Sequence, residues 1–143
     1  MKNMRILIDT NIILDLVQNR EPHTENASKI INSCVSLENI GYISAHSLSD
    51  LFFILRKYKT VEERKAIILH LCKYFKIISE SKDVFVSICN NPDWTDLEDG
   101  LQMKCAENEK LDYIITRDEK NGFKNSPVKI ISPEDFLKIK KNA

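Results

Sequence analysis

Four aspartates, Asp9, Asp50, Asp99 and Asp118, are the side chains in this sequence best suited to act together on a cation. Two like unit charges 4 Å apart repel by about 4 kcal/mol at an effective dielectric constant near 20. A cluster of carboxylates is therefore relieved by protonation, by a basic partner or by a bound cation. Because an oxygen-only ligand set favours a hard cation, the four acids point to Mg²⁺ or Mn²⁺. Such a cation can activate water and stabilise a phosphoryl transition state.

The elements that must bring these acids together are short apolar β runs that alternate with longer helical patterns. The predicted strands cover residues 5–9, 41–44, 76–79, 113–116 and 128–131. Because helical segments separate consecutive strands, we expect a mainly parallel sheet with helices on both faces, a three-layer α/β/α fold. The chain length suits a single domain over residues 1–143. Physical argument alone does not fix the strand order.

The predicted helices cover residues 10–18, 23–35, 45–58, 82–89 and 96–110, with one more after Thr60 and one after Ser132. Thr60 and Glu63 have the spacing of a capping box. Thr95 is the predicted N-cap of the helix at 96–110, with Glu98 at its capping-box position.

Three of the aspartates fall where the predicted strands end. Asp9 is the last residue of the first strand, Asp118 follows the fourth, and Asp50 lies in the first turns of the helix after the second. Ligands of doubly wound sheets gather at this carboxyl edge. A helix that leads into a parallel strand also begins there, so Asp96 and Asp99, which share one helix face, are expected at the same edge.

Each acid also has an ordinary structural explanation. Asp9 could cap the first helix, Asp50 could be a solvated helix residue, and Asp118 could cap a turn. Acids in the first turn of the helix at 96–110 are favoured by the helix dipole. No Lys or Arg occupies an equivalent strand end, although Arg117 is close in sequence. It is the convergence of the acids that favours a metal site.

Bulk composition narrows the class of protein. Hydrophobic residues make up 43% and charged residues 29%, as is usual for soluble globular proteins. No apolar run approaches the roughly 18 residues of a membrane span, and the N-terminus does not read as a signal peptide, so we expect a cytoplasmic protein. The 21 basic and 21 acidic residues cancel, which argues against coating of nucleic acid by bulk charge but not against local binding of RNA.

The four cysteines are widely spaced and form no C-x-x-C pair. Each lies in a helical pattern beside apolar neighbours, so we expect reduced core cysteines rather than a disulfide or a metal site. They are Cys34, Cys72, Cys89 and Cys105.

Four segments of the chain, taken together, resemble the PIN domain family. They are ILIDTN (6–11), SAHSLSDLFFILRK (44–57), DLEDGLQMKCA (96–106) and DYIITRD (112–118). The resemblance covers nearly the whole chain and depends on all four segments having the right order and spacing. The family includes VapC-type toxins of bacterial toxin–antitoxin pairs and other metal-dependent ribonucleases.

The resemblance implies a sheet of order 3-2-1-4-5 and an endonuclease that uses Mg²⁺ or Mn²⁺ on single-stranded or looped RNA. It also implies an antitoxin partner and a homodimer. The acid positions of the family match Asp9, Asp50, Asp99 and Asp118. By resemblance Asp9, Asp99 and Asp118 are the metal ligands, and Asp50 is a ligand or orients water. The supporting residues are Thr10, Asn11, Asp96, Glu98 and Thr116.

Two positions depart from the family pattern. Asp50 stands where many members have Glu, one methylene longer, so a direct metal contact there could become water-mediated. Gly100 stands where many members have Ala, which weakens the helix by about 1 kcal/mol but permits close packing.

Two other classes of function stay open at this stage. One is a non-catalytic PIN-like scaffold that binds RNA or protein, although its site would be expected to have lost an acid. The other is a receiver-like or phosphotransferase α/β domain in which Asp9 is a phosphorylated nucleophile. That chemistry usually needs a D-x-D motif or an acid pair with a later Lys, whereas Thr10 and Asn11 follow Asp9 here.

Overall fold

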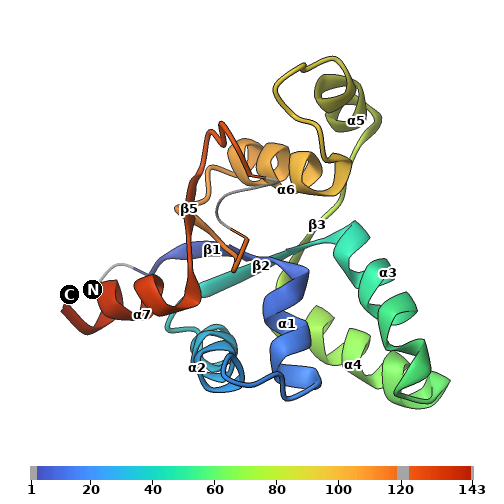
Figure 1. Ribbon diagram of the computed structural model, residues 1–143, viewed down its shortest axis with the longest axis vertical. Helices are drawn as coiled ribbons and strands as arrows, with labels where there is room; N and C mark the ends of the chain where they lie inside the picture. The colour runs from blue at the N-terminus through green and yellow to red at the C-terminus, as the bar shows by residue number, and fades with distance from the viewer. Residues whose placement is uncertain (1–2, 119–122, 143) are drawn as a thin grey trace.

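The computed structural model describes residues 3–118 and 123–142, which form a layered α/β structure (Figure 1). The strands are β1 (Arg5–Ile8), β2 (Ile40–Ser44), β3 (Lys76–Ile78), β4 (Tyr113–Ile115) and β5 (Lys129–Ile131). The α-helices are α1 (Thr10–Val17), α2 (Thr24–Val35), α3 (Ala45–Ile54), α4 (Val61–Tyr74), α5 (Lys82–Cys89), α6 (Leu97–Asn108) and α7 (Pro133–Asn142), and the short 3-10 helix η1 (Leu55–Lys57) follows α3. The predicted strands and helices are all present, with small shifts at their ends.

The strands pair in the order β3-β2-β1-β4-β5, and all four pairings are parallel. The predicted fold class and strand order are therefore confirmed. In the central strand, Ile6 pairs with Gly41 on β2 and with Tyr113 on β4. Receiver-like folds have the order 2-1-3-4-5 instead, so the receiver-like alternative is wrong.

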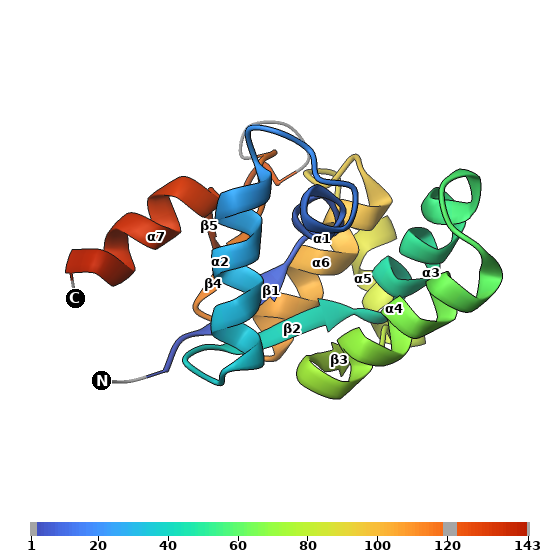
Figure 2. The ribbon, with the colours of Figure 1, turned by 90° about the horizontal axis from the view of Figure 1, so that it is seen from below.

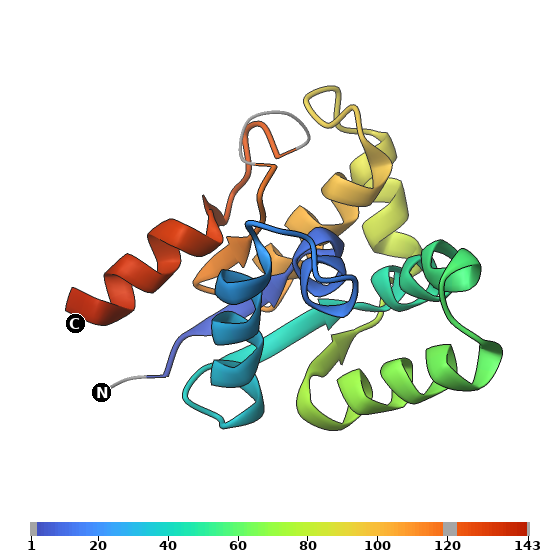
Figure 3. The ribbon, with the colours of Figure 1, turned by 60° about the horizontal axis from the view of Figure 1, so that its bottom comes forward.

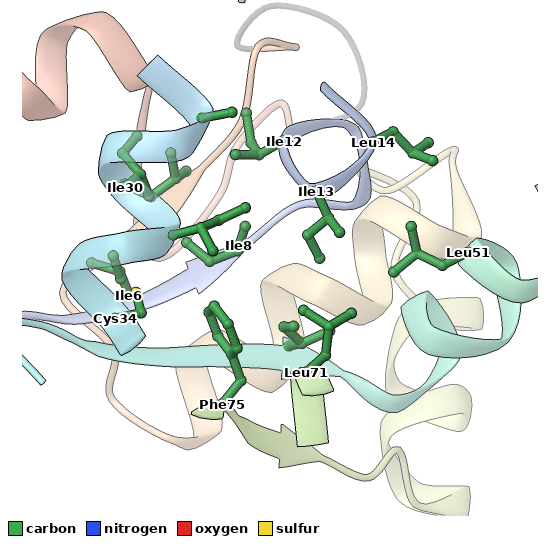
Figure 4. Close-up of a cluster of buried hydrophobic side chains, with 14 of the residues drawn as sticks. Ile6, Ile8, Ile12, Ile13, Leu14, Ile30, Cys34, Leu51, Leu71 and Phe75 are labelled. Carbon is green, nitrogen blue, oxygen red and sulfur yellow. The ribbon is translucent and has the colours of Figure 1, made fainter. Parts of the chain in front are cut away.

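The apolar residues of β1 are buried on both faces of the sheet. Ile6 and Ile8 pack with side chains of α1, α2, α3 and α4 on one face (Figure 4). Leu7 points to the opposite face and packs against Met103 and Ala106 of α6. All five side chains are 0% exposed. Because successive side chains of a strand alternate between faces, burial on both sides explains the continuous apolar sequence of β1.

The helices form the two outer layers. In Figure 1 the sheet runs between α5 and α6 above and α1, α2 and α4 below. Figure 2, seen from below, has α2 in front of the sheet and α6 behind it. Figure 3 shows α3 and α4 (green) as a helical hairpin beside the β2–β3 side of the sheet, in agreement with their packing contacts. None of the described helices has both the length and the apolar character needed to cross a membrane.

Local sequence signals explain several element ends. The Thr60 hydroxyl accepts from the Glu63 N–H at 3.1 Å, and the Glu63 carboxylate accepts from the Thr60 N–H at 2.9 Å, which confirms the predicted capping box. The Ser132 hydroxyl accepts from the Asp135 N–H at 3.1 Å, so α7 begins at Pro133 as the sequence indicates.

Two sequence expectations are wrong in part. The helix predicted over residues 45–58 ends at Ile54, where the chain tightens into η1: the Tyr58 N–H donates to Leu55 O, three residues back, which is the 3-10 pattern. Of the four cysteines, two are buried as expected and two are exposed, on α4 and α5. The buried ones are Cys34 and Cys105, and the exposed ones are Cys72 and Cys89.

Candidate active site

Asp9 lies at the carboxyl end of β1 and is held by several hydrogen bonds. Its N–H donates to Ile115 O at 3.0 Å, and the residue is 8% exposed. Oδ1 accepts from the Thr10 N–H at 2.7 Å and from Gln102 Nε2 at 2.9 Å, and Oδ2 accepts from the Thr116 hydroxyl at 2.7 Å. An ionised carboxylate has about four acceptor positions. Asp9 therefore caps α1 and still has one acceptor position, on Oδ2, for a further ligand.

Thr116 connects three of the sequence-predicted residues. Its hydroxyl donates to Asp9 and accepts from the Asp118 N–H at 3.0 Å and from Asn11 Nδ2 at 3.4 Å. Thr116 is 0% exposed. One buried hydroxyl thus ties the end of β1, the start of α1 and the segment after β4 to each other.

The first turn of α6 brings further acids to this edge. Asp96 is its N-cap, and Asp96 Oδ1 accepts from the Asp99 N–H at 2.9 Å. The prediction of Thr95 as the N-cap is wrong by one residue. Thr and Asp both cap helices well, and which of two neighbouring side chains turns toward the first turn is decided by tertiary packing.

The half-buried Asp99 is the acid most affected by its surroundings. Burial raises the pKa of the Asp99 carboxyl from 3.8 to about 7, and repulsion by Asp96, Asp9, Asp118 and Glu98 adds to the increase in that order. The acids predicted to converge therefore lie close enough to repel one another. The cluster therefore concentrates negative charge at this edge of the sheet.

Asp50 joins the cluster through Glu98. Burial raises the pKa of Glu98, repulsion by Asp50 and a hydrogen bond to Asp50 raise it further, and His46 acts in the opposite direction. Glu98 therefore keeps its proton to a higher pH than an isolated glutamate does. Asp50 and Glu98 thus come together as a carboxyl pair next to Asp99.

His46 pairs with Glu80, an acid that the sequence interpretation missed. Glu80 Oε1 accepts from the His46 N–H at 3.1 Å and lies 2.5 Å from His46 Nδ1. The Glu80 side chain is 7% exposed, so His46 serves as the partner of a buried carboxylate. Glu80 directly follows the third predicted strand, and the rule that acids after strands lie at the carboxyl edge would have identified it.

Arg117 does not neutralise the cluster. Its guanidinium donates to both carboxylate oxygens of Asp15, at 2.6 and 2.9 Å, and the Asp15 side chain is 1% exposed. This bidentate pair fixes the segment after β4 to α1. The cation closest to Asp118 in sequence is therefore engaged with a different carboxylate.

Gln102, on α6, was also missed from the sequence. It is 3% exposed and donates to Asp9. Gln102 lies three residues after Asp99 and therefore near the same helix face. A polar side chain between the apolar residues Leu101 and Met103 was the signal that could have identified it.

The donors gathered here suit a hard divalent cation in kind. They are carboxylates, a hydroxyl and amide oxygens, which Mg²⁺ and Mn²⁺ prefer. Asn11 Oδ1 and Gln102 Oε1 are buried, and no donor among the described residues reaches either of them. Within residues 3–118 and 123–142, no group of three or more Asp, Glu, His or Cys side chains has the arrangement of a metal site as it stands. The donor atoms are therefore of the kind that such a cation prefers, although the described side chains are not arranged as a complete set of metal ligands.

Several solved structures with a similar fold are of toxins or toxin–antitoxin complexes. A toxin–antitoxin complex from Klebsiella pneumoniae is 22% identical with a TM-score of 0.67, over 90% of this chain and 97% of that one. VapBC-1 from nontypeable Haemophilus influenzae is 15% identical with a TM-score of 0.68, over 92% and 99%. VapC20 from Mycobacterium tuberculosis, a sarcin–ricin loop cleaving toxin, is 11% identical with a TM-score of 0.61, over 76% and 86%. At these identities the likeness concerns the fold.

Comparison at the level of sequence gives the family. No curated protein sequence matches this chain. The family model of the PIN domain matches residues 5–120, which include β1 to β4 and every acid of the cluster. The chain belongs to the PIN domain family.

Proposed function

We propose that this chain is a single PIN domain, over residues 1–143, that hydrolyses RNA phosphodiester bonds with Mg²⁺ or Mn²⁺. The observation that carries the proposal is the acid cluster around Asp99, whose pKa is raised to about 7 by burial and by neighbouring acids. Negative charge gathered among oxygen donors at the carboxyl edge of a parallel sheet is what a hard cation relieves.

The proposed roles follow the positions of the acids. Asp9, Asp99 and Asp118 would hold the cation directly or through water, and Asp50 would be a further ligand or orient water. Thr10, Asn11, Thr116, Asp96 and Glu98 would support them. When bound, the cation would lower the pKa of a coordinated water and stabilise the charge that develops on the phosphate.

The chain's own contribution is position and proton control. Asp9 is held by three donors, so its free acceptor position is fixed before any ligand arrives. Burial and the neighbouring Asp50 raise the pKa of Glu98, which places a carboxyl group of increased proton affinity beside the cluster. In the described residues we find no Ser–His–Asp or Cys–His arrangement that would act as a side-chain nucleophile.

The partners are proposed from the similar structures. Toxin–antitoxin complexes share this fold, and one toxin of the same fold is named for cleaving the sarcin–ricin loop. We therefore assign this chain as the toxin of a type II toxin–antitoxin pair. It would form a homodimer, bind a cognate antitoxin protein and act on RNA in the cytoplasm. Its zero net charge favours RNA contacts confined to the site.

The test compares two matched aspartates. Asp99 and Asp135 are both third residues of a helix, and the N–H of each donates to its N-cap side chain at 2.9 and 3.1 Å. With a labelled structured RNA and Mn²⁺, Asp99→Asn should lose at least about 100-fold in cleavage, because even outer partners of metal sites are worth about 10- to 100-fold. Asp135→Asn should cleave like wild type.

The competing function is a non-catalytic scaffold. Under that interpretation wild type and both variants bind RNA equally and none of them cleaves it. Cleavage that persists in EDTA would instead reveal a metal-independent ribonuclease contaminant.

A further inference from the structure

Gln102 is buried where an apolar residue would be the simpler choice. Its neighbours along α6 include Leu101, Met103 and Cys105, which are 3%, 0% and 1% exposed, and Gln102 itself is 3% exposed. Burying an amide costs free energy unless its polar atoms find partners. If packing alone set this position, a side chain such as Met would fill the space without that cost.

The orientation of the Gln102 amide is determined by Asp9. Nε2 donates to Asp9 Oδ1 at 2.9 Å. Turning the amide over would place its oxygen against the carboxylate oxygen, two acceptors in contact, so the arrangement with Nε2 toward Asp9 is the favoured one. Oε1 is then buried, and no donor among the described residues reaches it.

Asn11 repeats this arrangement beside Thr116. Its Nδ2 donates to Thr116 Oγ1 at 3.4 Å, while its Oδ1 is buried without a donor from the described residues. A buried acceptor left unsatisfied costs about 1–3 kcal/mol, and proteins leave few of them. Two amides, each with its N–H on the Asp9–Thr116 pair and its oxygen free, indicate that a further donor belongs at this place.

We propose that Gln102 is a positioning residue of the nuclease site, an inference that rests on the proposed function. Its N–H fixes Asp9, and its Oε1 accepts a hydrogen bond from water held at the acid cluster. A neutral amide supplies that acceptor without adding a negative charge to carboxylates that already repel. Water among the acids is thereby oriented from α6, by a residue outside the four-acid set.

The experiment compares Gln102→Met, which keeps the approximate volume and removes both hydrogen-bonding groups, with Gln18→Met. Gln18 is the other glutamine of the chain and caps the C-terminal end of α1. For each purified protein, three quantities are measured: the melting temperature in EDTA, its increase in millimolar Mn²⁺, and kcat and KM for RNA cleavage.

We expect Gln102→Met to remain folded in EDTA and to lose at least half of the Mn²⁺-induced increase. Its kcat should fall by about 10- to 100-fold with KM within about twofold, the loss typical of an outer partner of a metal site. Gln18→Met should match wild type in all three quantities. A purely structural role would lower the melting temperature in EDTA and leave both the Mn²⁺ increase and kcat unchanged, which overturns the proposal.

Gln102→Glu is the second variant in case Gln102→Met does not fold. It keeps the shape and an acceptor oxygen but places a carboxylate oxygen against Asp9. The proposal expects a lower melting temperature in EDTA, a recovery of that loss in Mn²⁺, and a kcat at least about tenfold below wild type. Wild-type kcat in Gln102→Glu overturns it.

If wild type itself shows neither Mn²⁺ stabilisation nor Mn²⁺-dependent cleavage, the proposed function fails and the role of Gln102 fails with it. If wild type is stabilised by Mn²⁺ and cleaves RNA with it, and the Gln102 variants behave in the same way, the proposed function stands and this inference fails.

Discussion

Asp9 and Asp99 differ in how their charges are accommodated. Asp9 accepts three hydrogen bonds at 2.7 to 2.9 Å, so three of its roughly four acceptor positions are filled within the protein. Asp99 has other acids as its neighbours, which with burial raise its pKa to about 7. One acid thus provides a fixed position, and the other provides the charge that a cation would relieve.

Thr116→Val tests the hydroxyl that joins Asp9 to Asp118. Removing it leaves Asp9 Oδ2 and the Asp118 N–H without this partner in a buried place, which should lower the free energy of unfolding by about 1–3 kcal/mol. RNA cleavage should fall by about tenfold or more, because Asp9 is no longer held. Urea unfolding and an RNA cleavage assay measure the two effects. Thr116→Ser keeps the hydroxyl and is the control; equal stability and activity of the two variants would show that the hydroxyl has no such role.

The raised pKa of Asp99 predicts how the stability of the folded protein changes with pH. Between pH 3.8 and about 7 the folded protein holds the Asp99 proton while the unfolded chain has released it. The unfolded state therefore binds fewer protons, so stability decreases as pH rises through this range and levels off above it. In EDTA, wild type should lose on the order of 1–2 kcal/mol more than Asp99→Asn between pH 5 and pH 8, allowing for solvent screening.

Asp135→Asn is the control for this pH series and should keep the wild-type dependence. The measurement is urea unfolding at a series of pH values. Identical pH profiles for wild type and Asp99→Asn would mean that Asp99 does not titrate in this range.

At the scale of elements, α6 presents Asp99 and Gln102 because it packs closely against α5. A Cβ on Gly100 would lie 2.7 Å from Ile88 Cγ2. The close packing that we expected from Gly100, where many family members have Ala, is therefore present between α6 and Ile88 of α5. This packing limits how far α6 can shift.

Gly100→Ala should destabilise the protein despite the higher helix propensity of Ala. The gain in propensity is about 1 kcal/mol, whereas overpacking typically costs about 1–3 kcal/mol. Ile88→Leu removes the branch that the new methyl group would meet, so the double variant should recover part of the loss. Thermal unfolding of the two single variants and the double variant decides the matter. A Gly100→Ala protein more stable than wild type would contradict this packing argument.

The sequence predicted the elements better than it predicted the contacts between them. Strands and helices followed from apolar periodicity and capping signals such as Thr60 with Glu63. The strand order required the family resemblance, because local pattern does not specify which strands become neighbours. The N-cap of α6 was assigned to Thr95 instead of Asp96 for a similar reason. Both residues cap helices well, and the local sequence does not specify which of the two does so.

The acids were predictable because the carboxyl edge of a parallel sheet collects whatever follows its strands. That rule covered Asp9, Asp50 and Asp118, and it would also have covered Glu80. Gln102 has no charge to draw attention to it and is joined to Asp9 across 93 residues of sequence. Contacts of that kind depend on the tertiary packing of α6 against the sheet, which one sequence does not display.

For the whole molecule, zero net charge and a concentrated acidic site have a joint consequence. RNA gains little from bulk attraction to this protein, so productive binding requires that the negative edge be neutralised locally. A cation at the acids would meet that requirement and also supply the chemistry. Metal binding and cleavage should therefore depend on the same few carboxylates.

The most direct test of the central claim is the RNA cleavage rate of wild type and Asp9→Asn in Mn²⁺, each with an EDTA control. Asp9→Asn keeps the side-chain shape and removes one negative charge. Cleavage should fall by at least about 100-fold, since even outer partners of metal sites cost about 10- to 100-fold, while RNA binding stays equal or tightens. Asp50→Glu restores the commoner family residue and should retain substantial activity. Mn²⁺-dependent cleavage by Asp9→Asn at the wild-type rate would mean that the carboxylate cluster is not the active site.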